Sequence, residues 1–340
     1  MIVPLKVAVE KLKSGEVVAI PTETVYGLAA PINNLDAIKK IFSTKERPFF
    51  DPLIVHVSDI TQAKSLVKNW LPQCQVLAEA FWPGPLTLVI SKSTAVSDLI
   101  TSGLEGVGLR MPNHPIALQI INEVGVPLAA PSANKFGKTS PTMAIHVENE
   151  FKNEAVAVVD GGPCQVGIES TVLLVQQENG EVKFAVLRKG AITAEQISAA
   201  LAQQGLPALF FETTDKKVSP GHMKHHYMPA VPFVISKSED KVLDLHRIGQ
   251  EVFSELSRMP DEIEGIKIVK PEQSFNAPQE LKLSLDPALA ARSFYAQLRE
   301  IAQGDTDLIV FNYHESLHSQ PAWEALMERM FKAASLVLEN

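Results

Sequence analysis

The chain has 340 residues, 46% of them hydrophobic and 21% charged, which is typical of a folded globular protein and predicts about two domains. Its two cysteines, Cys74 and Cys164, lack the spacing of a zinc site or a disulfide framework, so we expect a cytoplasmic protein. No apolar run approaches the ~18–20 residues that span a bilayer, and the first ten residues do not resemble a signal peptide. We therefore expect no association with a membrane.

The net charge of −8 is unevenly distributed: residues 1–205 carry 17 basic and 19 acidic side chains, and residues 206–340 carry 14 and 20. This balance excludes a protein that coats nucleic acid through a general basic field. Any anionic ligand must be held by local clusters of charge.

The first predicted elements lead into a polar turn. Apolar spacing predicts a helix over 3–12 and a buried strand over 17–20. Thr22, Glu23, Thr24 and Tyr26 follow this strand directly. Because ligands in α/β proteins gather at the ends of strands, this turn is a candidate site, although an ordinary polar loop has the same composition.

A pair of cations follows the next predicted helix, which begins near Leu35. Lys45 and Arg47 precede a proline-bounded turn and a predicted strand over 53–57, which His56 interrupts. A guanidinium fork and a point charge on an exposed loop, anchored by a rigid strand, suit a phosphate ligand. The simpler alternative is a solvated helix end, with His56 satisfied in the core.

In the middle of the chain, predicted strands are again followed by polar residues. We expect helices over 60–68 and 72–81, strands over 86–90 and 107–110, a helix capped by Asn113, and a strand over 126–130. Ser132 and Asn134 follow the last strand, and Ser140-Pro141 has the composition of a helix start. Strands over 156–159, 172–175 and 181–187 then precede a helix over 193–203. Polar residues at strand ends or adjoining turns predict a shared anion-binding pocket: Thr22, Thr24, Lys45, Arg47, Arg110, Ser132, Asn134, Ser170 and Arg188.

The periodicity lapses over 206–232, a stretch that contains His222, His225 and His226. One interpretation of these histidines is a metal site, but no acidic or cysteine partner has suitable spacing. The alternative interpretation is an ordinary exposed linker. Beyond it, strands over 233–235, 266–269 and 308–311 alternate with helices over 241–258, 286–303 and 321–337. This alternation predicts a small parallel-sheet domain, and no glycine-rich dinucleotide motif opens it.

Taken together, five motifs resemble those of the YrdC/Sua5 family, the L-threonylcarbamoyladenylate synthases of tRNA modification. These are Pro21-Thr22-Glu23-Thr24-Val25-Tyr26-Gly27-Leu28, Lys45-Glu46-Arg47-Pro48, Pro52-Leu53-Ile54-Val55-His56, Pro131-Ser132-Ala133-Asn134 and Gly167-Ile168-Glu169-Ser170-Thr171. The linker and the small domain that follow residue 205 are similar to those of the Sua5 branch of the family. The resemblance implies a catalytic domain over 1–205, a linker or lid over 206–232 and a C-terminal domain over 233–340.

The resemblance also implies a fold and a reaction. The expected fold is α/β: an open twisted mixed sheet with helices, followed by a smaller Rossmann-like parallel domain. The expected enzyme is a nucleotidyltransferase that makes threonylcarbamoyl-AMP from L-threonine, bicarbonate or CO2, and ATP, with Mg²⁺ carried by ATP and no protein metal site. Its product would pass to a tRNA threonylcarbamoyltransferase, and direct tRNA binding would be weak.

Residue by residue, the resemblance implies three groups of contacts. Lys45 and Arg47 would be catalytic. The threonine contacts would be Thr24, His56, Arg110, Ala130 and Ser170. The ATP contacts would be Arg47, Asp51, Gly106, Ser132, Asn134, Ser140, Arg188 and, from the linker, Tyr227.

The sequence departs from the family at two places. Asp51 stands where the family often has asparagine, which removes an amide donor near ATP. The linker keeps Ser219-Pro220-Gly221 and His226-Tyr227, but His222-Met223-Lys224-His225 and Met228 differ from the residues common in the family.

Two other functions fit parts of the sequence. The same fold could bind structured RNA without catalysis, but this leaves the polar turns unexplained. A carbamoyl-transfer domain of a hydrogenase-maturation enzyme shares the core motifs, but it would need additional modules and cysteines that the chain lacks.

Overall fold

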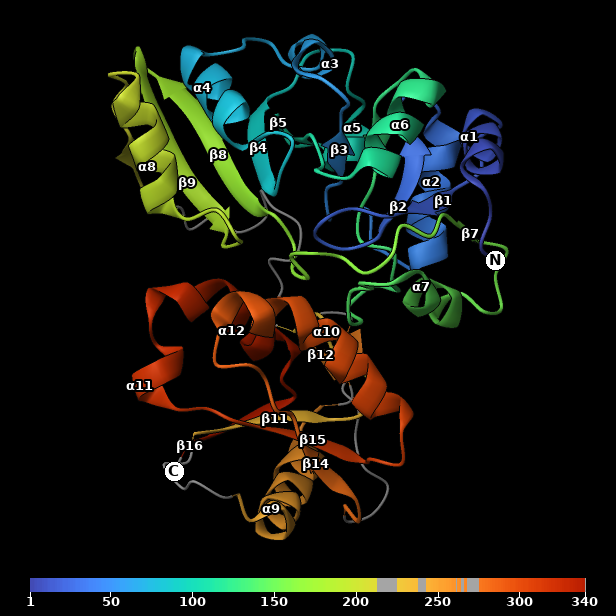
Figure 1. Cartoon of the computed structure of the whole chain (residues 1–340), viewed down its shortest axis with the longest axis vertical. Helices are drawn as coiled ribbons and strands as arrows, with labels where there is room; N and C mark the ends of the chain where they lie inside the picture. The colour runs from blue at the N-terminus through green and yellow to red at the C-terminus, as the bar shows by residue number, and fades with distance from the viewer. Residues whose placement is uncertain (213–224, 238–242, 261, 264–265, 268–274, 340) are drawn as a thin grey trace. The chain divides into compact units, whose positions relative to one another are not determined.

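The computed structural model describes residues 1–212, 225–237, 243–260, 262–263, 266–267 and 275–339. The chain forms two compact units, and each is described by itself. The first comprises the described residues of 1–135 and 141–222, and the second those of 136–140 and 223–340. The short segment 136–140 therefore belongs to the second unit, which a division in simple chain order does not anticipate. Figure 1 shows the elements of both units.

The first unit is built on a ten-stranded mixed sheet in the order β10-β9-β8-β4-β5-β3-β6-β2-β1-β7. Its strands are β1 (Val18–Ile20), β2 (Gly27–Pro31), β3 (Ile54–His56), β4 (Leu86–Ser91), β5 (Gly106–Arg110), β6 (Leu128–Ala129), β7 (Ala157–Val158), β8 (Thr171–Glu178), β9 (Glu181–Arg188) and β10 (Leu209–Phe210). Its helices are α1 (Leu5–Lys13), α2 (Leu35–Lys45), α3 (Ile60–Ser65), α4 (Pro72–Phe81), α5 (Asp98–Thr101), α6 (Pro115–Val124), α7 (Ala144–Glu150) and α8 (Ala194–Gln203).

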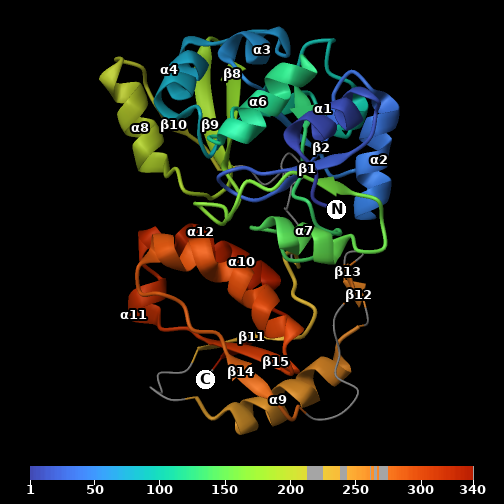
Figure 2. The same ribbon diagram turned by 45° about the vertical axis from the view of Figure 1, so that its right-hand side comes forward.

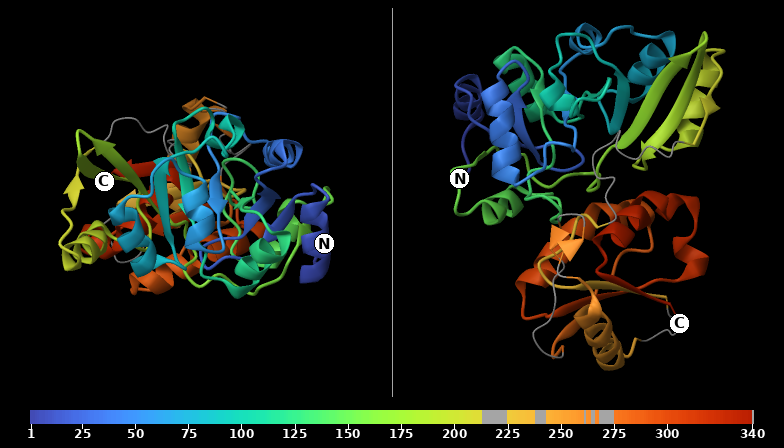
Figure 3. Two further views of the ribbon diagram at one scale, coloured as in Figure 1. Left: turned by 90° about the horizontal axis from the view of Figure 1, so that it is seen from above. Right: turned by 180° about the vertical axis from the view of Figure 1, so that it is seen from behind.

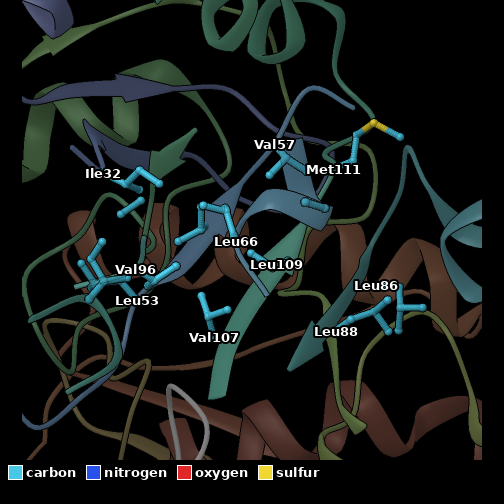
Figure 4. Packing of buried hydrophobic residues seen from close by; sticks show 14 of the residues in the cluster. Ile32, Leu53, Val57, Leu66, Leu86, Leu88, Val96, Val107, Leu109 and Met111 are labelled. Carbon is cyan, nitrogen blue, oxygen red and sulfur yellow. The ribbon is translucent and has the colours of Figure 1, made fainter. Parts of the chain in front are cut away.

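Along the central strands, side chains that point into the apolar core alternate with side chains on the opposite face of the sheet, which includes polar residues. Figure 4 shows part of the main apolar cluster, to which Leu53, Val57, Val107, Leu109, Leu86 and Leu88 contribute. Because successive side chains of a strand point to opposite faces, the other face of β3, β5 and β4 carries His56, Arg110 and Thr87. On the same face, β5 has Gly108 and Gly106 at the positions leading away from Arg110. The strands themselves thus place buried polar groups on one face of the sheet.

Helices cover other parts of this sheet. α1 packs on α6, and together with β1, β2 and β6 they enclose a second apolar cluster. α8 packs on α4 beside the long β8–β9 hairpin, which Figure 3 shows from behind. Among the described residues, no helix combines the length and the apolar character that crossing a bilayer requires.

The second unit contains a parallel four-stranded sheet in the order β14-β15-β11-β16. Its elements are β11 (Phe233–Lys237), α9 (Leu245–Arg258), β14 (Pro278–Glu280), α10 (Pro287–Gln303), β15 (Leu308–Asn312), α11 (Glu315–His318), a 3₁₀ turn (Pro321–Trp323), α12 (Glu324–Ala333) and β16 (Leu336–Glu339), with the separate hairpin of β12 (Glu262–Ile263) and β13 (Ile266–Lys267). α9 covers one face of this sheet, and α10 and α12 cover the other (Figure 2). The prediction of a mixed sheet plus a smaller parallel domain is confirmed.

Several predicted elements are wrong in detail. No helix starts at Ser140-Pro141, because the Pro141 carbonyl accepts Tyr26 N–H at 2.9 Å and the Thr142 carbonyl accepts Cys164 N–H at 2.9 Å, so α7 begins only at Ala144. These bonds to distant segments replace the bonds of a first helical turn.

Other boundaries differ for similar reasons. Asn113 is not a cap, since α6 begins after His114 with Pro115 in its first turn. The predicted helix over 321–337 ends at Ala333, and Leu336–Glu339 forms β16 against β11. Ile266–Lys267 pairs with Glu262–Ile263 and not with the parallel sheet; the remainder of that predicted strand lies outside the described residues.

Candidate functional site

The turn after β1 is fixed by its own hydroxyl groups and by the tyrosine that follows. Thr22 Oγ1 accepts the N–H groups of Thr24 and Val25, each at 3.2 Å, and lies 2.9 Å from Thr24 Oγ1. The Tyr26 hydroxyl donates to the Gly162 carbonyl at 2.8 Å and accepts Gly161 N–H at 3.1 Å. Such side-chain bonds to nearby backbone groups give a turn one conformation. Thr24 is fully buried by this arrangement.

Arg110, at the end of β5, joins this turn to the centre of the sheet. Its Nε donates to the Gly84 carbonyl at 3.2 Å, and its Nη1 donates to Thr24 Oγ1 at 2.8 Å. Its Nη2 lies 2.7 Å from Glu23 Oε2, and both side chains are 5% exposed. The guanidinium is therefore held in one orientation by three groups from two loops.

His56 lies beside Arg110, because β3 and β5 pair in register with His56 opposite Arg110. Burial, reinforced by the charge of Arg110, lowers the pKa of His56 to about 3. Its Nδ1 is buried and has no hydrogen-bond partner among the described residues. A neutral imidazole that can both donate and accept hydrogen bonds suits an uncharged polar group such as a hydroxyl.

The lowered pKa of His56 predicts a specific dependence of stability on pH. The unfolded chain takes up this proton near pH 6.5 and the folded chain only near pH 3, so the stabilisation is complete above pH 6.5 and is lost as the pH falls toward 3. When the pH falls from 7.5 to 5, the free energy of unfolding of the wild type should decrease by about 2 kcal/mol more than that of His56→Gln. Urea unfolding of both proteins at each pH measures this, and parallel pH profiles would contradict it.

Lys45 and Arg47 occupy buried positions, contrary to the prediction of an exposed loop. Lys45 is the last residue of α2 and is 1% exposed; its Nζ donates to the carbonyls of Ser132 and Asn134 at 2.6 and 2.5 Å. Burial, reinforced by the nearby charge of Arg47, holds the pKa of Lys45 well below its usual range. Lys45 thus connects the end of α2 to the Ser132–Asn134 loop.

Arg47 is 7% exposed and is turned toward the loop that follows it. Its Nε donates to the Asp51 carbonyl at 3.2 Å and its Nη2 to the Pro52 carbonyl at 2.9 Å, while Asp51 Oδ2 lies 2.9 Å from Nη2. The Asp51 side chain is 1% exposed, so the two charges form a buried ion pair. In place of the amide expected at this position, the chain carries a counter-ion for Arg47.

Ser170 and Arg188 form a third group at the start of β8 and the end of β9. Arg188 Nε donates to the Ser170 carbonyl and its Nη2 to Ser170 Oγ, both at 3.1 Å, and Ser170 Oγ lies 2.8 Å from Thr87 Oγ1. A Cβ at Gly190 would lie 2.3 Å from the Thr171 nitrogen, so only glycine lets the chain after Arg188 pass this close.

The register of the strands determines where the polar residues described above lie relative to the short strand β3. His56 and Arg110 lie at one end of it, and Ser170 lies at the same edge because β4, which begins beside Arg110, pairs with β8. At the other end, Ala130 N–H donates to the Ile54 carbonyl at 3.0 Å, and the chain continues to Ser132. Three residues of strand span roughly 10 Å. His56 with Arg110, and the chain that leads to Ser132, therefore lie at opposite ends of one short strand.

Three predicted nucleotide contacts remain, namely Gly106, Ser140 and Tyr227. Gly106 begins β5 at the end opposite Arg110, and a Cβ there would come within 2.8 Å of Val89 Cγ1, so a larger residue would require Val89 to shift. Ser140 and Tyr227 belong to the second unit, and their contacts with a nucleotide stay predictions. Sequence reasoning missed the contacts of Glu23, Gly84 and Thr87; an acid inside a buried turn was the one available signal.

Residues 225–228 of the linker are well packed, whereas residues 206–212 are partly or fully exposed. Tyr227 is 1% exposed and lies 5.7 Å, ring to ring, from Tyr295 of α10. Its φ of 67° is unusual for a residue other than glycine. The Thr139 hydroxyl donates to the Tyr227 carbonyl at 3.0 Å, and Met228 N–H donates to the Gly137 carbonyl at 2.8 Å. Residues 225–228 are thus not an exposed tether, whereas 213–224 lie outside the described residues.

The described residues contain no group of three or more His, Cys, Asp or Glu side chains arranged to hold a metal ion. His222, one of the three linker histidines, lies outside the described residues.

Comparison with known proteins identifies relatives along nearly the whole chain. A family model described as "Telomere recombination" (Sua5/YciO/YrdC) matches residues 10–190, and one described as "Threonylcarbamoyl-AMP synthase, C-terminal domain" matches residues 192–335. A threonylcarbamoyl-AMP synthase of Bacillus subtilis is 38% identical over 326 residues, covering 95% of this chain and 90% of that protein. One from Pyrococcus abyssi is 35% identical over 333 residues, covering 97% and 94%.

A solved structure agrees with these relatives. The crystal structure of P. abyssi Sua5 complexed with L-threonine superposes with a TM-score of 0.78 at 31% identity, covering 98% of this chain and 96% of that one. The match extends through both units. The chain therefore belongs to the Sua5/YciO/YrdC family and carries the C-terminal domain of its threonylcarbamoyl-AMP synthases.

Proposed function

We propose that this chain is a nucleotidyltransferase that makes L-threonylcarbamoyl-AMP from L-threonine, bicarbonate or CO2, and ATP, and releases pyrophosphate. The observation that carries the proposal is the pair of polar groups around β3. One contains a guanidinium, hydroxyls and a neutral imidazole, and the other contains Lys45 and Arg47. The relatives named threonylcarbamoyl-AMP synthase, at 35–38% identity over most of the chain, support it.

The first group suits the amino acid. Arg110 offers a guanidinium for the threonine carboxylate, and Thr24, Ser170 and neutral His56 offer partners for its hydroxyl and amine. A site that pairs a buried substrate hydroxyl discriminates strongly against analogues that lack it. Threonine, and more weakly serine, should therefore bind, and valine should bind far worse.

The second group suits the phosphates of ATP. The threonine amine captures CO2 as a carbamate, and a carbamate oxygen must then attack the α-phosphate although both groups are negative. This step depends on positioning and charge screening more than on proton transfer. Lys45, Arg47, Arg110 and Arg188 are the cations for this task, with Asp51 orienting Arg47. Mg²⁺ would arrive with the phosphates of ATP, as nucleotidyl transfer usually requires.

The remaining assignments are also part of the proposal. Asn134, Ser132, Gly106, Ser140 and Tyr227 would complete the nucleotide site, and the backbone of Ala130 would complete the threonine site. The adenylate would pass to a tRNA threonylcarbamoyltransferase for modification of position 37 of ANN-decoding tRNAs. The two buried free cysteines, Cys74 and Cys164, are in keeping with a reducing cytoplasm.

Pyrophosphate release by the purified chain tests this function. Release should require ATP, threonine and bicarbonate together, and replacing threonine by valine should abolish it. Release that is independent of threonine, or ATP hydrolysis that is stimulated by RNA alone, would overturn the proposal.

A further inference from the structure

Glu23 is a buried acid to which no function has been given above. Its side chain is 5% exposed, and its Oε1 accepts no hydrogen bond among the described residues. Its backbone is fixed on two sides, because its carbonyl accepts Val166 N–H at 2.7 Å and the Thr22 hydroxyl closes the turn around it. A carboxylate in such a place needs a cation nearby to offset the loss of hydration.

Arg110 is that cation, and its contacts with neighbouring residues leave some N–H groups of its guanidinium without a hydrogen bond among the described residues. Nε and one N–H of Nη1 are bonded to Gly84 and Thr24, whereas Nη2 touches the carboxylate of Glu23 at 2.7 Å without a well-directed hydrogen bond. Because a guanidinium is planar, these three contacts fix the direction of its remaining N–H groups.

We propose that Glu23 is a positioning residue for amino-acid recognition: it holds Arg110 so that the remaining N–H groups of the guanidinium meet the carboxylate of the substrate. This inference rests on the proposed use of threonine. Removing the charge of Glu23 leaves a buried guanidinium uncompensated, and it would then turn toward other acceptors. Recognition of the carboxylate should suffer, whereas recognition of the ammonium and hydroxyl groups should not.

The test uses Glu23→Gln in the full chain and two ligands that differ in one group. L-Threonine has the carboxylate, and L-threoninol replaces it with an alcohol while keeping the ammonium and hydroxyl groups. Dissociation constants from calorimetry should rise about 10-fold or more for threonine in the variant, and less than about 2-fold for L-threoninol. Glu105→Gln is the matched control, because Glu105 is an exposed acid paired with Lys68, and it should change neither constant.

The outcomes separate this inference from its rivals. Equal losses for threonine, L-threoninol and 3-hydroxybutyrate would overturn it and indicate general disruption of the site. An unchanged constant for threonine would also overturn it. A large loss for threonine together with an equally large loss for L-threoninol, but none for 3-hydroxybutyrate, would mean that Glu23 reads the ammonium group directly, and would overturn it too.

Two further results keep the test decisive. Wild type that binds no threonine would refute the proposed function itself, and this inference with it. If Glu23→Gln does not fold, Glu23→Asp takes its place, because it keeps the charge on a shorter stem. Threonine affinity must then fall while L-threoninol affinity stays, and equal changes would overturn the inference.

Discussion

Replacing Arg47 by lysine is expected to lower the rate of adenylate formation by about two orders of magnitude. Lysine keeps the positive charge for Asp51, so the buried carboxylate retains a partner. It cannot, however, form the contacts that Arg47 makes with the Asp51 and Pro52 carbonyls, and a point charge does not replace a guanidinium fork on phosphate. The measurement is the initial rate of pyrophosphate release at saturating threonine.

Threonine affinity provides the internal control for this variant. Its contacts are assigned to Arg110, Thr24 and His56, none of which is bonded to Arg47 in the interactions described above, so the dissociation constant for threonine should stay within about 2-fold of wild type. Arg258→Lys, at an exposed position of α9, should be silent in both assays. If Arg47→Lys keeps its activity, or loses threonine affinity and thermal stability in parallel, Arg47 has a structural function only.

The second large effect concerns Lys45→Met. Methionine removes the donor that satisfies the partly buried carbonyl of Ser132 and the buried carbonyl of Asn134. Each carbonyl left without a partner costs about 1–3 kcal/mol, partly offset because burying the amine is itself unfavourable, so we expect a loss of about 2–3 kcal/mol in the free energy of unfolding. Activity should fall more than the loss of folded protein explains, because the Ser132–Asn134 loop is no longer held at the site.

Lys39→Met is the matched control for Lys45. Lys39 is an exposed residue of the same helix and pairs with Asp36 at 3.0 Å, and surface pairs of this kind contribute about 0–1 kcal/mol. Urea unfolding and the rate of pyrophosphate release should therefore change little. Equal destabilisation by the two variants would show that the buried position of Lys45 has no special importance.

The sequence predicted the apolar strands and the polar turns, because both have local signals. Strands β3 and β5 were found from their apolar runs, and the turn at Thr22–Tyr26 from polar residues directly after a buried strand. Strand β2 was missed, since Gly27–Pro31 is rich in residues of low strand propensity, and it is formed by pairing with β1 and β6.

Contacts between distant segments could not be predicted. The motif predicted a function for Arg47, but its burial against Asp51 depends on how the loop after α2 folds back. In the same way, Ser140-Pro141 has the composition of a helix start, but hydrogen bonds from Tyr26 and Cys164 prevent one. Composition describes what a segment can form alone, and tertiary hydrogen bonds decide between the alternatives.

The central claim is that the groups around β3 join threonine, CO2 and the adenylyl group of ATP. Its most direct test supplies the purified chain with ATP, threonine and ¹³C-bicarbonate and identifies the nucleotide product by mass spectrometry. The account predicts a threonylcarbamoyl adenylate with a labelled carbonyl carbon and an equal amount of pyrophosphate, and almost none of it with Arg47→Lys. A threonyl adenylate without the label, or AMP formed without threonine, would contradict the account.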